Sequence, residues 1–178
     1  EFDLATQRFK TLLQGNVDAI YFNEKLYIGK REEVFVYNES TGNFDLFYHL
    51  AGKNITLSCL HLDKNKNLWL GTTSNGIYCL SEDKSLSRPV TKGNITSIYE
   101  DSSNELWIGS WEEGLYRVKT DGSIENLRHN PMNTNSLCSN FVRSCCEDNS
   151  GDLWIGTFNG LNRYDRETGK FHLYTANG

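Results

Sequence analysis

Basic charge, long apolar runs and paired cysteines are all scarce in this chain of 178 residues. The 18 Lys and Arg residues are outnumbered by 23 Asp and Glu residues, so the chain lacks the basic excess that nucleic-acid binding requires. No apolar run approaches the ~20 residues that a membrane-spanning helix needs. Because 38% of the residues are nevertheless hydrophobic, the chain can bury a sizeable core.

Disulfide, metal and cofactor sites find little support in the sequence. The five Cys and four His residues form no C-x-x-C pair and are dispersed along the chain. Cys145 and Cys146 are neighbours on an expected strand, so their side chains point to opposite faces. Cys59 and Cys79 fall on strands separated by another strand, beyond the ~7 Å reach of a disulfide. We interpret the cysteines as small buried hydrophobic residues and predict no metal and no cofactor.

Catalytic motifs are also missing from the sequence. There is no H-E-x-x-H motif, no nucleophile elbow and no glycine-rich phosphate loop before a helix. The adjacent acids Glu112 and Glu113 could serve a glycosidase, but solvated loop acids explain them more simply. Asp-rich segments such as 148–152 resemble the start of a calcium loop, although ordinary hairpin turns are favoured. We predict no catalytic residues and a chain that is not an enzyme.

A recurring phrase is the most informative feature that the sequence does have. Leu-Trp-(Leu/Ile)-Gly occurs at 68–71, 106–109 and 153–156, with a weaker Leu-Tyr-Ile-Gly at 26–29. Its glycines stand at positions 29, 71, 109 and 156, so the intervals are 42, 38 and 47 residues. An Asp lies six residues before each Trp, at Asp63, Asp101 and Asp148. This spacing indicates a structural repeat of about 40 residues.

The repeat unit reads as four short strands. In one copy we expect strands at 142–147, at the Trp phrase, at 161–165 and at 171–174, with polar turns between them. Gly76, Gly114 and Gly160 close the loop after the Trp strand, where a positive φ would cost little. Four antiparallel strands in such a unit are typical of a β-propeller blade. We therefore predict an all-β fold, with about four four-stranded antiparallel blades.

The residues also carry a family resemblance. The stretch 130–174, NPMNTNSLCSNFVRSCCEDNSGDLWIGTFNGLNRYDRETGKFHLY, resembles the two-component regulator propeller repeat. The resemblance implies the periplasmic sensor of a hybrid two-component histidine kinase, common in Bacteroides and its relatives, on the periplasmic side of the inner membrane in a membrane-anchored receptor. It also implies detection of polysaccharide-derived oligosaccharides and regulation of glycan-utilisation genes. The kinase activity would lie elsewhere in such a receptor.

The first residues of the chain match the end of the last repeat. Residues 1–9 align with 163–171, which predicts half a blade at 1–14 ahead of whole blades at approximately 15–50, 54–91, 93–128 and 138–176. We expect a single partial propeller over 1–178, cut from a longer receptor. Its expected partners are a glycan fragment, the remaining blades and domains of the receptor and a second copy in a homodimer, because uncovered apolar faces favour self-association.

A candidate ligand site follows from comparing the repeats with one another. The loop after the Trp strand varies most, at 30–33, 73–75, 111–113 and 158–159, and so does the second residue of each first strand. An aromatic plate beside charged groups is what a sugar ring requires. The predicted ligand-binding residues are Lys30, Arg31, Trp111, Glu112, Arg143, Phe158 and Asn159. If the basic pair reaches the site, an anionic glycan is favoured.

Three functions remain open at the level of the sequence. The first is a sensor module that binds a ligand without turnover and passes a rearrangement to a kinase. The second is a structural or dimerisation scaffold whose receptor binds its ligand elsewhere. The third is a carbohydrate-active or quinone-dependent propeller enzyme, because fold does not determine function.

Overall fold

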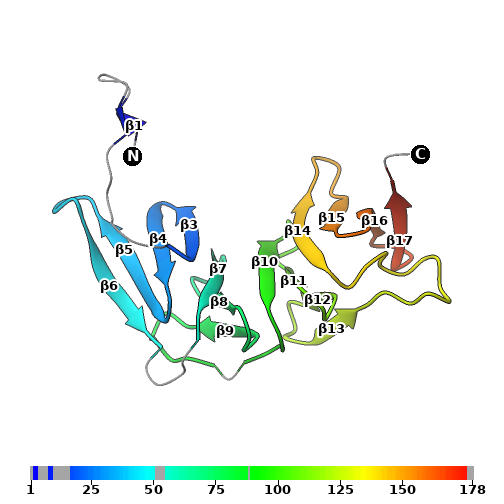
Figure 1. Cartoon of the computed structure of the whole chain (residues 1–178), viewed down its shortest axis with the longest axis horizontal. Helices are drawn as coiled ribbons and strands as arrows, with labels where there is room; N and C mark the ends of the chain where they lie inside the picture. The colour runs from blue at the N-terminus through cyan, green and yellow to red at the C-terminus, as the bar shows by residue number, and fades with distance from the viewer. Residues whose placement is uncertain (1, 4–7, 10–16, 51–54, 88, 176–178) are drawn as a thin grey trace.

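Four β-sheets of three or four strands are arranged side by side in an arc, and a two-stranded sheet precedes them (Figure 1). The computed structural model describes residues 2–3, 8–9, 17–50, 55–87 and 89–175, and all of its regular elements are strands. The first strand of each sheet lies on the inner side of the arc and the last strand lies outside (Figure 1). The predicted all-β propeller architecture is confirmed, and the arc is not a closed ring.

Each sheet is one blade of antiparallel strands in sequence order. The first blade is β3 (Ala19–Asn23), β4 (Lys25–Lys30), β5 (Glu33–Asn38) and β6 (Asn43–His49). The second is β7 (Leu57–Leu62), β8 (Leu68–Thr72) and β9 (Ile77–Leu80). The third is β10 (Ile95–Glu100), β11 (Leu106–Ser110), β12 (Leu115–Val118) and β13 (Ile124–Leu127). The fourth is β14 (Val142–Glu147), β15 (Leu153–Thr157), β16 (Gly160–Asp165) and β17 (Lys170–Tyr174).

A short hairpin precedes these blades. It pairs β1 (Phe2–Asp3) with β2 (Arg8–Phe9) in antiparallel register. Its pairs Phe2–Phe9 and Asp3–Arg8 correspond to Tyr164–Phe171 and Asp165–Lys170 in the fourth blade; the other residues of the predicted half-blade at 1–14 lie outside the described residues.

The second blade has an irregular segment where the other blades have a fourth strand. A single bridge joins Leu80 to Leu86, and Ser87 and Val90 donate backbone hydrogen bonds to Cys79 and Ile77 on β9. Pro89 lies within this segment and has no N–H to donate to a ladder. The segment therefore follows β9 without forming a regular strand.

The Asp and Trp of each repeat are joined by a hydrogen bond. The Trp Nε1 group donates to the Asp Oδ2 atom at 2.8 Å in the second and third blades and at 2.7 Å in the fourth. The other carboxylate oxygen accepts the N–H of the residue four positions after the Asp, at 2.8 to 3.1 Å. The Asp-rich turns are hairpin turns closed by their own carboxylate, which explains the fixed six-residue spacing.

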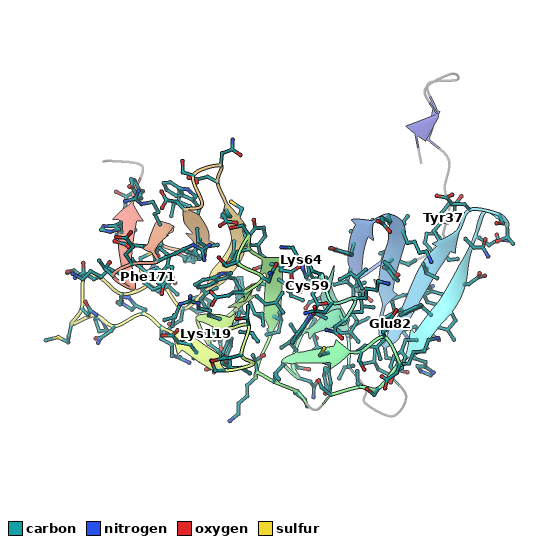
Figure 2. All side chains as sticks on the ribbon, turned by 180° about the vertical axis from the view of Figure 1, so that it is seen from behind. Tyr37, Cys59, Lys64, Glu82, Lys119 and Phe171 are labelled. Atoms are coloured by element: carbon teal, nitrogen blue, oxygen red, sulfur yellow. The ribbon has the colours of Figure 1, made fainter. Side chains whose placement is uncertain are left out.

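Three hydrophobic clusters fill the three spaces between neighbouring blades. We call the side of a blade that contacts the preceding blade its leading face, and the side that contacts the following blade its trailing face. In the junction of the third and fourth blades, Trp107 and Leu115 of one trailing face pack against Val142 and Ile155 of the next leading face. Figure 2 shows the side chains that fill these spaces, including Cys59 beside the third blade.

The glycine of the Trp phrase permits this close approach. A Cβ atom on Gly109 would lie 2.8 Å from Val142 Cγ1, and one on Gly71 would lie 2.9 Å from Ile95 Cγ2. The loop glycines serve a different purpose, because Gly76 and Gly114 have φ angles of 75° and 82°. Close packing between blades therefore explains the glycine of the Trp phrase, and a positive φ explains the loop glycine.

Candidate functional site

The loops after the Trp strands lie at the same end of each blade as the start of its first strand. Antiparallel pairing requires this, since Ile95 pairs with Ser110 and Val142 pairs with Thr157 at the end of the Trp strand. We call this end of the arc the loop rim; it comprises residues 30–33, 73–75, 111–113 and 158–159 with the first-strand positions Asp18, Ser58, Thr96 and Arg143.

Aromatic rings from the third and fourth blades form a row on the loop rim. Trp111 packs edge-on against Phe141 with ring centroids 5.5 Å apart, and Phe141 lies 6.2 Å from Phe158. The Arg143 guanidinium stands 5.2 Å from the centroid of the Trp111 ring, a cation–π distance. We call Trp111, Phe141, Arg143 and Phe158 the aromatic cluster. The structure thus brings together three of the predicted residues.

Much of the aromatic cluster is open to solvent. The Phe158 side chain is 67% exposed, Arg143 is exposed, and Trp111 and Phe141 are half-buried. An exposed large aromatic residue on a loop contributes little to the core, so its apolar face is available for contact with a ligand.

A hollow of about 260 Å³ adjoins Trp111. It is lined by Thr73, Ser74, Gly93, Asn94, Trp111, Glu112 and Glu113. Hydroxyl, amide and carboxylate groups therefore surround one aromatic wall. The volume is below the ~300–1,000 Å³ of sites for drug-sized ligands, so the hollow suits one end of a larger molecule.

Arg128 fixes one side of this hollow. Its Nη2 atom donates to the Glu112 carbonyl oxygen at 3.2 Å, and its Nη1 atom pairs with the Glu113 carboxylate. The Glu113 carboxylate is thus already paired, whereas the Glu112 side chain is exposed. Of the two acids, Glu112 is the one free to accept hydrogen bonds from a ligand.

The first-strand positions differ between blades for structural reasons. The Ser58 hydroxyl donates to the Ile95 carbonyl at 2.5 Å, and the Thr96 hydroxyl donates to the Val142 carbonyl at 2.7 Å, so both link a blade to the next one. Arg143 instead reaches back to Trp111 in the preceding blade. The residue type therefore varies at these positions because Ser58 and Thr96 link neighbouring blades, whereas Arg143 is a candidate ligand contact.

Lys30 and Arg31 lie in a different hollow. It has a volume of about 420 Å³ and is lined by Asp18, Lys30, Arg31 and Glu33, so two basic and two acidic residues share its lining. The Arg31 backbone N–H donates to Asp18 Oδ2 at 2.5 Å. This hollow shares no lining residue with the hollow at Trp111. Asn159 is exposed in the turn after β15, where its N–H donates to Thr157 Oγ1 at 3.2 Å.

Phe141 is the member of the aromatic cluster that the sequence analysis missed. It precedes the first strand of the fourth blade, and its carbonyl accepts the Phe158 N–H at 2.9 Å. The equivalent residues of the second and third blades are Thr56 and Asn94. A change from polar to aromatic at this repeat position is the signal that could have identified it.

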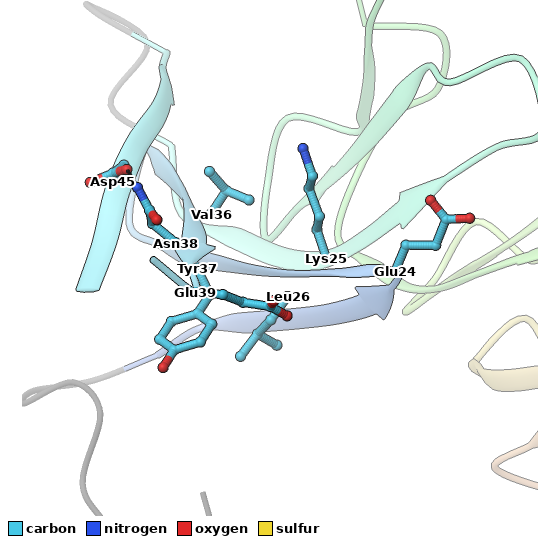
Figure 3. A pocket seen from close by; sticks show the side chains of 8 residues that line it. All are labelled: Glu24, Lys25, Leu26, Val36, Tyr37, Asn38, Glu39 and Asp45. Atoms are coloured by element: carbon cyan, nitrogen blue, oxygen red, sulfur yellow. Dashed lines mark hydrogen bonds between the residues drawn. The ribbon is translucent and has the colours of Figure 1, made fainter. Parts of the chain in front are cut away.

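Other hollows lie at the opposite end of the blades. One, of about 380 Å³, adjoins the turns that follow β3 and β5 and is lined by Glu24, Lys25, Leu26, Val36, Tyr37, Asn38, Glu39 and Asp45. Figure 3 shows the carboxylates of Glu24 and Asp45 at its two ends. Asn38 Nδ2 already donates to Asp45 Oδ2 at 2.7 Å.

Burial and hydrogen bonds shift the pKa values of two cysteines and one aspartate in opposite directions. Burial raises the pKa of Cys59 and of Cys145 to about 12, so both stay neutral near pH 7. Burial by itself would raise the pKa of Asp101, but hydrogen bonds from Trp107 and Arg166 have the larger effect, so its pKa lies below its usual value.

The described ranges contain no group of three metal-binding side chains. They also contain no helix with the length and apolar character that a membrane span requires.

Comparison with known families gives one match. The family model for the two component regulator propeller matches residues 49–74, 89–112 and 136–159. Each matched segment contains the first strand, the Asp turn and the Trp strand of a blade, from the second blade to the fourth. No curated protein sequence matches the chain.

Solved structures share the fold at low sequence identity. The extracellular domain of a protein named as a hybrid two-component system of Bacteroides thetaiotaomicron is 20% identical, with a TM-score of 0.70, over 97% of this chain and 30% of that one. A streptogramin B lyase is 18% identical, with a TM-score of 0.70, over 89% and 54%. A catalytically inactive virginiamycin B lyase from Staphylococcus aureus, solved with quinupristin, is 16% identical, with a TM-score of 0.70, over 89% and 55%. This chain thus spans about a third to just over half of these proteins, and the likeness shows the propeller fold.

Proposed function

Because this chain carries repeats of the two-component regulator propeller family, we propose that it is part of the extracytoplasmic sensor of a hybrid two-component histidine kinase. The family match supports the sensor role, and the fold shared with the extracellular domain from B. thetaiotaomicron supports an extracytoplasmic location. In this proposal the receptor is anchored in the inner membrane, and its kinase regulates glycan-utilisation genes.

The proposed ligand is an oligosaccharide released from a polysaccharide, bound at the aromatic cluster. The observation that carries this proposal is the row of three rings, with Phe158 exposed and Arg143 over the ring of Trp111. Sugar rings stack their C–H faces on aromatic side chains and need fixed polar partners for their hydroxyl groups. Phe158 supplies an open ring, and Glu112 and Ser74 line the adjoining hollow.

Electrostatics at the aromatic cluster do not restrict the ligand to acidic sugars. Arg143 is its one basic member, and Glu112 lies close by. Lys30 and Arg31, which would favour an anionic glycan, line their own hollow together with Asp18 and Glu33. The proposed site therefore suits a neutral sugar or one that carries a single carboxylate.

Calorimetric titration of the chain with neutral and acidic oligosaccharides tests this proposal. Trp111→Ala or Phe158→Ala should weaken binding by ~1 kcal/mol or more, roughly a five- to ten-fold rise in Kd, because each removes a stacking surface. Ile124→Ala is the matched control, since it also truncates an exposed apolar side chain but lies on β13. Unchanged binding in both aromatic variants, with loss in Arg31→Ala, would move the site to the first blade.

An enzyme is the second candidate, because the lyases show that this fold can carry catalysis. Chromatography of each oligosaccharide, and of quinupristin, before and after incubation with the chain separates the two functions. The sensor proposal predicts binding without product. Product formation that is lost in a variant of the loop rim would establish the enzyme instead.

A further inference from the structure

A second hollow at the end opposite the loop rim lies between the first and second blades. Its volume is about 380 Å³, and residues of both blades line it. Three lysines belong to this lining, Lys25 from the first blade and Lys66 and Lys84 from the second. We call it the lysine hollow.

The interior of the lysine hollow is apolar. Among the residues that line it, Tyr27, Leu68 and Leu80 are buried, and Phe47 and Leu62 are half-buried. Tyr27 packs edge-on against Phe47 with ring centroids 5.5 Å apart. The lysines are exposed, so cationic groups surround an apolar interior.

The junction of the third and fourth blades has an ion pair at the corresponding place. There Arg166 Nη1 donates to Asp101 Oδ2 at 2.7 Å. The residue at the repeat position of Arg166 in the second blade is Glu82, since each lies two positions after the residue that pairs with the Leu of the Trp phrase. Glu82 is 74% exposed and lies 3.8 Å from Lys66 of its own blade.

The first blade also lacks a counterpart of the Asp101 turn. Residues 101–105 separate β10 from β11, whereas Glu24 alone separates β3 from β4. Neither member of the ion pair that joins the third and fourth blades is therefore present between the first and second, and the lysine hollow occupies this place.

Turn geometry does not explain the two lysines of the second blade. Lys66 and Lys84 have φ angles of 63° and 64°, in the left-handed region. Their counterparts with positive φ are Asn104 and Gly151 for Lys66, and Gly42, Gly122 and Gly169 for Lys84. A left-handed backbone is unfavourable for Lys and costs Gly little, so Gly would form both turns more easily.

Two of the three lysines have charges that no carboxylate neutralises. Among the described residues, no carboxylate lies within ion-pair distance of Lys25 or Lys84. Lys84 Nζ instead stands 5.0 Å from the centroid of the Phe47 ring, and Lys25 extends to the opposite side of β4 from Leu26 (Figure 3). Three lysines and two glutamates line the hollow, so it is locally positive in a chain whose net charge is -5.

We propose that the lysine hollow binds a small organic anion that carries an apolar group, of which an arylalkyl carboxylate is the simplest. The apolar group packs against Phe47 and Leu62, and the carboxylate accepts hydrogen bonds from Lys25 and Lys84. The volume lies within the ~300–1,000 Å³ of small-molecule sites, so the hollow holds a whole small ligand. This site is at the other end of the blades from the aromatic cluster, so it does not depend on glycan binding there.

Titration of the isotope-labelled chain with 3-phenylpropionate, followed by nuclear magnetic resonance, tests this site. We expect saturable shifts of the amide signals at 24–25, 66 and 82–84. The uncharged 3-phenylpropanamide has the same ring and should bind about ten-fold more weakly, because it lacks the charge that the lysines recognise. Equal Kd values for the two compounds, or saturable shifts confined to the loop rim, would overturn the proposal.

A glycine variant separates binding from folding. Lys84→Gly introduces the residue that three other blades have at this position, so it should fold as well as the native chain and raise the Kd of 3-phenylpropionate about ten-fold. Lys84→Arg should retain binding. Asn104→Gly is the matched control, since it changes a left-handed turn residue of the third blade outside the hollow, and it should leave the Kd unchanged. An unchanged Kd in Lys84→Gly would contradict the proposal.

Discussion

At the residue scale, the hydrogen-bonded Asp and Trp pair is what makes each repeat recognisable. The carboxylate closes the turn with one oxygen and holds the indole N–H with the other, so only Asp at this distance from Trp does both. The same pair is buried in the third blade, whereas in the fourth blade Asp148 is exposed and Trp154 is half-buried. We therefore expect the pair to contribute more to the free energy of unfolding in the third blade than in the fourth, although its geometry is the same in both.

Asp101→Ala should destabilise the chain by about 2 kcal/mol or more, because it leaves the buried Trp107 N–H unpaired and removes a partner of Arg166. Asp148→Ala is the matched control and should cost less, since its Trp154 partner can turn to water. Denaturant titration monitored by circular dichroism gives both free energies of unfolding. Equal losses would mean that burial does not set the strength of the pair.

The glycine of the Trp phrase offers a second comparison between blades. Gly71→Ala should cost about 1–3 kcal/mol, because the new methyl group would lie 2.9 Å from Ile95 of the next blade and 2.4 Å from Cys59. Gly156→Ala meets only Ser144 and should be tolerated better. Thermal unfolding of the two variants tests whether the glycines serve close packing of blades; a more damaging Gly156→Ala would contradict it.

The repeat reveals scaffold residues far better than it reveals site residues. Asp63, Asp101 and Asp148 recur because each closes the same turn and holds the Trp in the last three blades, so spacing alone identifies them. Comparison of the loops did not identify Phe141, because this residue lies just before β14 and outside the loops that vary most. Sequence places Lys30 and Arg31 at the same rim as Trp111, but only the structure shows that the hollow they line shares no residue with the hollow at Trp111.

At the scale of elements, strand positions follow directly from the alternation and turn chemistry of the repeat. The predicted first strand at 142–147 matches β14 residue for residue, and β7 and β10 occupy the same position in the second and third repeats. The fourth-strand position of the second blade is harder to predict, because Pro89 interrupts its hydrogen bonding without removing the backbone from the sheet edge.

The junction of β7 and β10 contains a histidine whose protonation is linked to folding. His61 on β7 lies 3.6 Å from the Glu100 carboxylate on β10, and both side chains are largely buried. Burial lowers the pKa of His61 below its usual value near 6.5, although Glu100 partly opposes this. A base with a lowered pKa in the folded state binds protons more readily when unfolded.

The free energy of unfolding should therefore be fully maintained above pH 6.5 and should decrease as the pH falls through and below that value. His61→Gln should flatten this part of the curve, because Gln does not titrate. Urea titrations between pH 7.5 and 5 measure both curves. A variant that loses stability with acid as steeply as the native chain would exclude His61 as the cause.

At the scale of the whole molecule, the chain is an arc in which each blade is held mainly by its neighbours. Three junctions contain the core, and the faces at the two ends of the arc expose apolar residues such as Ile20 and Leu161. A repeat architecture of this kind draws its stability from contacts between adjacent units. The sequence predicted the arc because the repeat defines each blade, but it could not show which blades share a ligand surface.

The central claim is that ligand recognition belongs to the loop rim of the third and fourth blades. Hydrogen–deuterium exchange of the chain, with and without an oligosaccharide that binds it, tests this claim most directly. The account predicts slower exchange at 111–113, 141–143 and 158–159 when the glycan is bound, with little change at 30–33. Protection confined to 30–33, or to the turns at the opposite end of the blades, would contradict it.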